Sequence, residues 1–283
     1  MLKFPTLTEQ IKDLYEFSKN PAQRIRTGLD PIDKMCGGPA PGEVFMVVGR
    51  SFAGKSIVAQ NIIWHNRHEP SIFFSLEMPY LLAVQRLYSI WSDTPATDVQ
   101  DMTERGALPE MLKYMAEDFP QHHIVDTEAL ALDSMSFYVD EYERLYKLRP
   151  SFVVIDYLEL VAGAKKSGDG WNATEVQATS LKDWAKKEQM RVFVLHQTNK
   201  QELPWSAPTE SSPRGGGYTE ADFVVGMWQK SRDPDMSDAD YLYYRDKVNF
   251  NVLKNRAYGS LSGKRNLLFS MRPSLRLEAW DVV

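Results

Sequence analysis

A glycine-rich segment that directly follows an apolar run constrains this chain more than any other feature. Residues 49–56 read Gly-Arg-Ser-Phe-Ala-Gly-Lys-Ser, and residues 44–48 before them read Val-Phe-Met-Val-Val. The segment fits the pattern G-x-x-x-x-G-K-[ST], in which backbone N–H groups of a turn and of the next helix bind phosphate oxygens. A buried strand, this turn and a helix in direct succession predict a phosphate-binding loop.

The residues of the turn have expected places at a bound nucleotide. Lys55 would reach the β- and γ-phosphates, and the Ser56 hydroxyl would bind Mg²⁺. We therefore expect ATP and Mg²⁺ as ligands. The turn that binds them is predicted to consist of Gly49, Arg50, Ser51, Phe52, Ala53, Gly54, Lys55 and Ser56.

The composition indicates a globular chain with a large core. Its 283 residues are 43% hydrophobic and 25% charged, which fits one large domain. No stretch approaches the roughly 20 apolar residues that span a membrane, and the start carries no apolar secretory segment. The single cysteine, Cys36, excludes an internal disulfide and a thiolate metal cluster. We expect a cytoplasmic protein without membrane contact, in which Cys36 is a small packing residue.

Short apolar runs alternate with helical patterns along most of the chain, which is typical of an α/β domain with a mainly parallel sheet. Strands are expected at 44–49, 71–76, 122–126, 151–156 and 191–197, and helices near 56–67, 78–92, 133–147 and 173–189. The helical patterns stop near residue 223. Beyond it we expect a β-rich edge of the same sheet, with strands at 223–229, 244–256, 265–272 and 275–280.

Residues 1–26 are predicted to form an arm apart from a domain of residues 27–283. Thr6 and Glu9 have the spacing of a capping box, and apolar residues follow at helical spacing up to Pro21. The arm helix either packs on its own domain or docks on a neighbouring subunit, and both possibilities stay open. Its apolar residues are Leu7, Ile11, Leu14 and Tyr15.

Two acidic residues follow apolar strands at the edge where the phosphate-binding loop is expected. Asp156 ends the run 152–155, and Glu77 follows the run 71–76. Because the carboxyl ends of parallel strands meet at one edge of a sheet, both carboxylates are expected beside the phosphates. We predict that Asp156 holds Mg²⁺ together with Ser56 and that Glu77 polarises the attacking water.

Several short motifs occur in the order of one known family. They resemble motifs of the RecA-like ATPase domain of DnaB-type replicative helicases over roughly residues 26–273. The resemblance implies a RecA-like P-loop fold, with a twisted sheet flanked by helices, and an ATP-driven helicase that moves on single-stranded DNA in replication. The motifs are Thr27-Gly28-Leu29-Asp30-Pro31-Ile32-Asp33, Ser75-Leu76-Glu77-Met78-Pro79, Ile155-Asp156-Tyr157-Leu158-Glu159-Leu160, Leu195-His196-Gln197-Thr198-Asn199-Lys200 and Lys254-Asn255-Arg256.

The resemblance also implies roles for single residues. Glu77 is similar to the family's catalytic glutamate, Asp156 to its metal-side aspartate, and Gln197 to the polar sensor that couples the γ-phosphate to DNA-binding loops. Lys254 and Arg256 resemble the lysine and arginine fingers inserted into the ATP site of the adjacent subunit. Fingers supplied in trans imply a homo-oligomer, a hexameric ring or spiral, as the active form.

Nucleic-acid contacts are predicted in two loops that leave the carboxyl ends of strands, 163–170 and 200–217. The formal net charge of −5 argues against a uniformly basic binder but leaves local basic patches open. Cations attract the sugar-phosphate backbone without regard to sequence, and glycines permit its close approach. The predicted contacts are Lys165, Lys166, Lys200, Arg214, Gly215, Gly216 and Gly217.

The chain departs from the family pattern in a few places. Cellular members carry an N-terminal helical domain that binds primase, whereas only the short arm precedes the ATPase motifs here. A primase or a helicase loader is still among the partners that the resemblance implies, and the brevity resembles phage-encoded members. His196 stands where a serine is usual and Thr198 where a leucine is usual, while Gln197 is retained. We expect His196 to be a packed or loop histidine.

Two other functions stay open. A RecA-like recombinase or strand-annealing factor would use the same ATP site but assemble as a filament on single-stranded DNA. A non-helicase regulator would use ATP to control assembly with a protein partner and would lack DNA-stimulated turnover. The Lys254 and Arg256 pair favours the helicase over the recombinase, and the retained Glu77 and Gln197 argue against the regulator.

Overall fold

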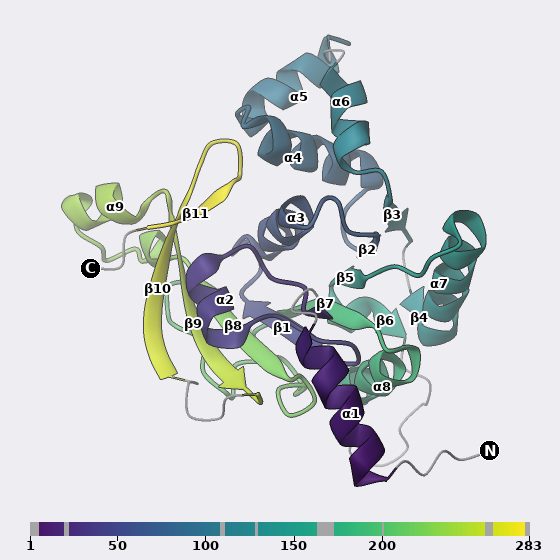
Figure 1. Cartoon of the computed structure of the whole chain (residues 1–283). Helices are drawn as coiled ribbons and strands as arrows, with labels where there is room; N and C mark the ends of the chain where they lie inside the picture. The colour runs from purple at the N-terminus through teal and green to yellow at the C-terminus, as the bar shows by residue number, and fades with distance from the viewer. Residues whose placement is uncertain are drawn as a thin grey trace.

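A twisted nine-stranded sheet runs through the molecule, with helices on both of its faces (Figure 1). The strand order is β11-β10-β9-β8-β1-β7-β5-β2-β3. The structure is a computed structural model, and it describes residues 6–19, 23–107, 111–127, 130–162, 173–199, 201–257 and 263–280.

The strands on one side of this order run parallel, as predicted. Helices cover both faces of the sheet, so β1, β2, β5 and β8 are mostly apolar and buried throughout, whereas the edge strand β3 is half-buried. The register pairs Gly49 with Gln197 and Ser75 with Asp156, which brings residues singled out by sequence to one edge. These strands are β1 (Val44–Gly49), β2 (Ser71–Ser75), β3 (His122–Asp126), β5 (Phe152–Asp156), β7 (Arg191–Gln197) and β8 (Phe223–Trp228).

Antiparallel strands extend the sheet beyond β8, which confirms the predicted β-rich edge. The expectation that helices stop near residue 223 is wrong. A helix, α9 (Asp238–Tyr244), lies between β8 and β9, and the strand expected from residue 244 begins only at Lys247. Ser237 caps this helix by accepting a hydrogen bond from the Asp240 N–H at 3.1 Å. The edge strands are β9 (Lys247–Asn255), β10 (Gly263–Met271) and β11 (Leu277–Ala279).

The four expected helices are present to within two residues at each end. They are α3 (Lys55–His65), α4 (Tyr80–Ser92), α7 (Leu132–Tyr146) and α8 (Ala173–Glu188). Residues of α3 and α4 pack on one face of the sheet, and residues of α7 and α8 pack on the other. None of the described helices combines the length and the apolar character needed to cross a membrane.

Short helices that sequence patterns did not predict pack on the α3 side of the sheet. They bury one or a few apolar residues each, so their periodicity is too brief to recognise. Cys36, at the end of the first of them, is fully buried in the core as expected, and burial raises the pKa of its thiol to about 12. These helices are α2 (Asp30–Cys36), α5 (Ala96–Glu104) and α6 (Met111–Asp118).

The arm helix is α1 (Leu7–Lys19). Its capping box is confirmed, because the Thr6 N–H donates to Glu9 Oε2 at 2.6 Å and the Glu9 N–H donates to Thr6 Oγ1 at 3.3 Å. The rest of the described chain leaves its apolar stripe uncovered. The exposed fractions are 70% for Leu7, 56% for Ile11, 64% for Leu14 and 61% for Tyr15.

Candidate functional site

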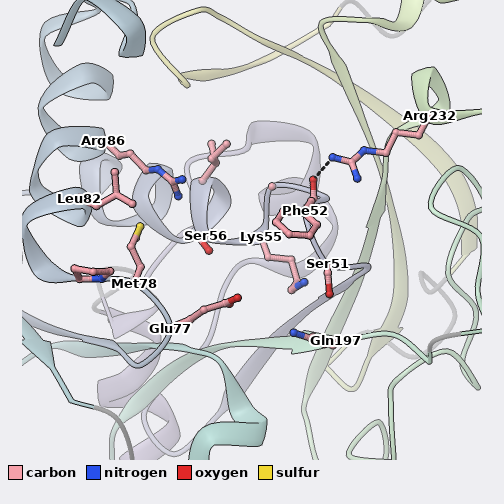
Figure 2. A pocket seen from close by; sticks show the side chains of 13 residues that line it. Ser51, Phe52, Lys55, Ser56, Glu77, Met78, Leu82, Arg86, Gln197 and Arg232 are labelled. Atoms are coloured by element: carbon pink, nitrogen blue, oxygen red, sulfur yellow. Dashed lines mark hydrogen bonds between the residues drawn. The ribbon is translucent and has the colours of Figure 1, made fainter. Parts of the chain in front are cut away.

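A cavity of about 470 Å³ opens around the glycine-rich turn at the carboxyl edge of the parallel strands (Figure 2). The turn after β1, the segment after β2, one face of α4 and the end of β7 all contribute to it. The predicted phosphate-binding loop, Glu77 and Gln197 therefore share one cavity. Its lining residues are Ser51, Phe52, Gly54, Lys55, Ser56, Ile57, Glu77, Met78, Pro79, Leu82, Arg86, Gln197 and Arg232.

Two positions of the turn require glycine, one because a neighbouring strand is close and one because of its own backbone conformation. A Cβ atom at Gly49 would lie 2.8 Å from Met227 Cγ on the neighbouring strand β8. Gly54 has φ +98°, a left-handed conformation that favours glycine, and it begins α3. Because Gly54, Lys55 and Ser56 line the cavity, the N-terminus of α3 presents its free backbone N–H groups there. The site is thus built to receive an anion.

Lys55 lies at the centre of this anion site. Its Nζ donates hydrogen bonds of 3.0 Å to the carbonyl oxygens of Gly49 and Arg50. Burial lowers the pKa of Lys55, while Asp156, Glu159 and Glu77 act in the opposite direction. An ammonium held by two carbonyl oxygens can exchange them for phosphate oxygens, which bind it more strongly because they are charged.

Asp156 and Ser56 supply the oxygen atoms of a cation site. Asp156 ends β5 and is 1% exposed, and its Oδ2 has no hydrogen-bond partner in the described part of the chain. Burial raises the pKa of Asp156 to about 6, against the hydrogen bond donated by the Ser56 hydroxyl. Nearby Glu77 raises it further.

A hydroxyl and an unpartnered carboxylate oxygen are hard donors of the kind that Mg²⁺ takes. Within the described ranges no cluster of three or more His, Cys, Asp or Glu side chains forms a metal cage. This donor set suits Mg²⁺ well, because Mg²⁺ uses one or two protein oxygens and completes its shell with phosphate oxygens and water. The residues present therefore fit the ion expected from the sequence.

Glu77 and Gln197 point toward the space beside Lys55 (Figure 2). Glu77 is exposed in the segment after β2, where a water molecule can reach it. Gln197 ends β7, and its N–H donates to Glu159 Oε1 at 3.1 Å. Its carbonyl accepts the Arg214 N–H at 2.8 Å. The end of β7 is therefore joined both to Glu159 and to the glycine-rich segment that follows.

Lys254 and Arg256 do not line this cavity. Lys254 pairs with Val224 near the start of β8, whereas the cavity lies at the opposite, carboxyl edge of the parallel strands. Lys254 Nζ donates to the carbonyls of Tyr218 and Thr219 at 3.0 and 2.8 Å, and Arg256 donates to the Thr219 carbonyl at 3.1 Å. Both side chains thus reach the same turn, in keeping with a shared face, and neither serves the cavity of its own chain.

The predicted nucleic-acid contacts divide into two groups. Outside the described residues lie Lys165, Lys166 and Lys200. The remaining four form the segment 214–217, whose Gly215, Gly216 and Gly217 have φ values of +73°, +99° and +89°. The backbone shape of the segment accounts for these glycines. Contact with nucleic acid remains a prediction for this segment.

Two arginines at the cavity were missed by sequence reasoning. Arg86 on α4 acts to lower the pKa of Asp156. Arg232, in the short 3-10 helix η3 (Lys230–Arg232), donates to the carbonyl of Phe52 (Figure 2). Neither residue lies in a recognisable motif, because α4 and η3 meet the turn only in the folded chain. Both bring positive charge to a cavity suited to phosphates.

A family model for the DnaB-like helicase C-terminal domain matches residues 24–272. The chain belongs to this family. Among its DnaB relatives, the replicative DNA helicase DnaB of Treponema pallidum (strain Nichols) is 26% identical over 237 residues, or 79% of this chain and 51% of the relative. The DnaB of Leifsonia xyli subsp. xyli is 28% identical over 229 residues, which are 73% of this chain and 47% of the relative. This DnaB-like chain thus spans about half the length of these relatives.

Solved structures share the fold of this DnaB-like chain. One of them, an ATPase domain, superposes with a TM-score of 0.78 at 17% identity, covering 99% of this chain and 100% of that chain. A second structure, of a DnaB-like replicative helicase and its interactions with primase, has a TM-score of 0.74 at 18% identity. The match covers 99% of this chain and 68% of that chain. The RecA-like α/β fold expected from the DnaB-like motifs is therefore confirmed.

Proposed function

We propose that the protein is an ATP-dependent helicase or translocase that acts on single-stranded DNA in replication and hydrolyses ATP at interfaces between subunits. One observation carries this proposal. The phosphate-binding turn, Glu77 and Gln197 line one cavity, and the Asp156 carboxyl accepts a hydrogen bond from Ser56 of that turn, in a chain of the DnaB-like helicase family. Each of the four positions has a chemical task in phosphoryl transfer to water.

The tasks follow from the contacts at the cavity. The N-terminus of α3 and Lys55 bind the phosphates of ATP. Mg²⁺, held by Ser56 and Asp156 with phosphate oxygens, would neutralise charge on those phosphates. Glu77 accepts a proton from the attacking water and thereby orients it. Arg256 of a neighbouring copy, with its Lys254, stabilises the transferring phosphoryl group. This role is assigned to a neighbouring copy because neither residue lines the cavity of its own chain.

The uncovered stripe of α1 supports assembly into a homo-oligomer. A row of exposed apolar residues needs a covering partner in the active state. Each copy also offers an apolar groove of about 350 Å³ between α4, α6 and the edge strand β3. In the proposed hexameric ring or spiral, α1 of one copy docks on the next. The arm of residues 1–26 and the ATPase domain of residues 27–283 are thus distinct parts of the assembly.

Single-stranded DNA is the proposed substrate, bound at the loops 163–170 and 200–217. The link from Gln197 to the Arg214 N–H supports a route from the γ-phosphate to the second loop. A helicase loader or a primase is a further proposed partner, since a DnaB-like relative was solved with its interactions with primase. A replication enzyme of this kind works in the cytoplasm.

Unwinding of a forked DNA duplex tests the proposal. Purified protein is compared with Lys55→Ala, and hydrolysis with and without single-stranded DNA is recorded in the same samples. We expect the wild-type protein to unwind the duplex and the Lys55→Ala variant to leave it paired. DNA-stimulated hydrolysis without strand separation would instead identify a recombinase or annealing factor. Hydrolysis that DNA does not stimulate would identify an ATP-dependent regulator of assembly.

A further inference from the structure

We infer that His196 is a positioning residue that couples the segment 214–217 to the catalytic edge of the sheet. The inference rests on the proposed function and adds a second connection to the one through Gln197. The imidazole lies between Glu159, which accepts the Gln197 main-chain N–H, and Gly216, in the segment proposed to contact DNA. The imidazole is fully buried and does not line the cavity, so its effect passes through the groups that it contacts.

The contact with Gly216 fixes one side of the ring. His196 is fully buried on β7, and its Nε2 lies 3.1 Å from the Gly216 carbonyl oxygen. A carbonyl oxygen can only accept, so the Nε2 atom carries the hydrogen and donates it. The ring therefore presents its other nitrogen, Nδ1, toward Glu159.

The contact with Glu159 fixes the other side. This residue lies in the 3-10 helix η2 (Leu158–Leu160), and its Oε1 is 3.2 Å from His196 Nδ1. The pair stands at ion-pair distance without an aligned hydrogen bond, and Nδ1 has no other polar partner in the described residues. The buried ring therefore lies in contact with Glu159 on one side and with Gly216 on the other.

Glu159 in turn belongs to the nucleotide side of the molecule. The same Oε1 accepts the Gln197 N–H at 3.1 Å, and the charge of Glu159 acts on buried Lys55. A continuous set of contacts therefore leads from Gln197, which lines the cavity, through Glu159 and His196 to Gly216. Coupling between two ligand sites travels through contacts of this kind when they change together.

The segment 214–217 is packed closely against its neighbours and is tied to the end of β7. Gly216 has φ +99°, and a Cβ atom there would lie 3.4 Å from the Glu175 side chain on α8. Two tethers join the segment to the end of β7: the main-chain bond from the Arg214 N–H to the Gln197 carbonyl, and the bond from His196 to the Gly216 carbonyl. The second uses a side chain, so substitution can remove it alone.

Two amide substitutions separate the contacts of the ring. In His196→Gln the amide nitrogen reaches the position of Nε2 and can still donate to Gly216. In His196→Asn the shorter amide reaches only the position of Nδ1, so the Gly216 carbonyl loses its donor. Both variants bring a similar polar group into the buried site, which makes them matched controls for each other.

The measurement is the ratio of ATP hydrolysis with saturating single-stranded DNA to hydrolysis without it, taken with the melting temperature. We expect this ratio to be lower in His196→Asn by about fivefold or more. Fivefold is the lower end of ordinary coupling between two sites. Its DNA-free rate and its KM for ATP stay near those of the wild type, since His196 lies outside the cavity. His196→Gln keeps the ratio within about twofold, because the donor is retained.

The outcomes separate this inference from the proposed function. If single-stranded DNA does not stimulate ATP hydrolysis by the wild-type protein, both the proposed function and the role of His196 are refuted. If His196→Asn keeps the wild-type stimulation of ATP hydrolysis by DNA, the role of His196 alone is overturned. The same holds if both variants lose this stimulation equally at unchanged melting temperature. If His196→Asn fails to fold, the folded His196→Gln variant decides the matter: retained stimulation supports the tether to Gly216, and lost stimulation refutes it.

Discussion

Lys182 Nζ lies 2.5 Å from Asp222 Oδ2, and both side chains are buried where α8 meets the residue before β8. The same carboxylate oxygen accepts the Val44 N–H at 2.8 Å, and the other oxygen pairs with Arg256 at 3.0 Å. Asp222 thus joins a helix, the strand that leads to the phosphate-binding turn and the proposed finger residue. Desolvation of these charges is offset by their mutual attraction and hydrogen bonds, and removal of the buried cation would leave the carboxylate under-compensated.

Substitution Lys182→Ala is expected to lower the free energy of unfolding by roughly 3–5 kcal/mol, because it leaves the Asp222 carboxylate buried without its ammonium partner. Urea denaturation at neutral pH measures the change. Lys186→Ala is the matched control on the same helix, since Lys186 is exposed. Its effect should stay within about 0.5 kcal/mol. Equal losses in both variants would show that the ion pair is not what stabilises this junction.

Arg256→Ala is expected to bind ATP normally but to lose turnover in the assembled protein, with a decrease of about 10³-fold if the residue acts as a finger in trans. Its own fold should change by no more than about 1 kcal/mol, because Arg256 is half exposed and its ion pair with Asp222 is screened.

Mixing two inactive variants checks the trans assignment. Lys55→Ala retains Arg256, and Arg256→Ala retains an intact phosphate-binding turn. Mixed assemblies should therefore contain some complete sites and regain hydrolysis. Arg245→Ala, which removes an exposed arginine elsewhere, serves as the control and should remain active. A mixture that stays inactive although the subunits exchange would contradict a finger from the neighbouring copy.

The α1 stripe should govern assembly and not the stability of the single chain. Ile11→Ser combined with Leu14→Ser removes apolar side chains that are 56% and 64% exposed, so little burial is lost within one copy. We expect the sedimentation profile to shift toward smaller species at equal melting temperature. Lys12→Ser on the same helix should leave the profile unchanged. Normal assembly of the double variant would mean that α1 does not dock on a neighbour.

Asp156 makes stability depend on pH in a defined direction. Burial raises its pKa from the ordinary value of 3.8 to about 6. The folded state therefore holds this proton more tightly than the unfolded state, and the resulting stability is lost as the pH rises through 6. Asp156→Asn cannot ionise. In metal-free buffer, wild type should lose about 2 kcal/mol relative to this variant between about pH 4.5 and about pH 8.

Chemical denaturation of both proteins at the two pH values, with a chelator present, measures this difference. Asp183→Asn, which changes an exposed carboxyl on α8, should follow the wild type at both values. A difference between wild type and Asp156→Asn that does not change with pH would show that Asp156 ionises alike in the folded and unfolded chains.

Strands and strand-end residues were predictable because the signals are local and repeated. A parallel strand buried on both faces reads as a continuous apolar run, so β5 and the position of Asp156 at its end follow from five consecutive residues. The short helices gave no such signal. The helix α9 depends on a cap at Ser237, and α5 and α6 gain most of their stability from packing against neighbours.

By itself the sequence determined the phosphate-binding turn, because the left-handed conformation of Gly54 and the reach of Lys55 to the Gly49 carbonyl lie within eight consecutive residues. Tertiary structure alone decided that Arg232 joins that turn and that His196 is buried between Glu159 and Gly216. These contacts link segments far apart in the chain. They arise from strand order and from the packing of loops over the sheet edge, and neither leaves a periodic or contiguous signal in the sequence.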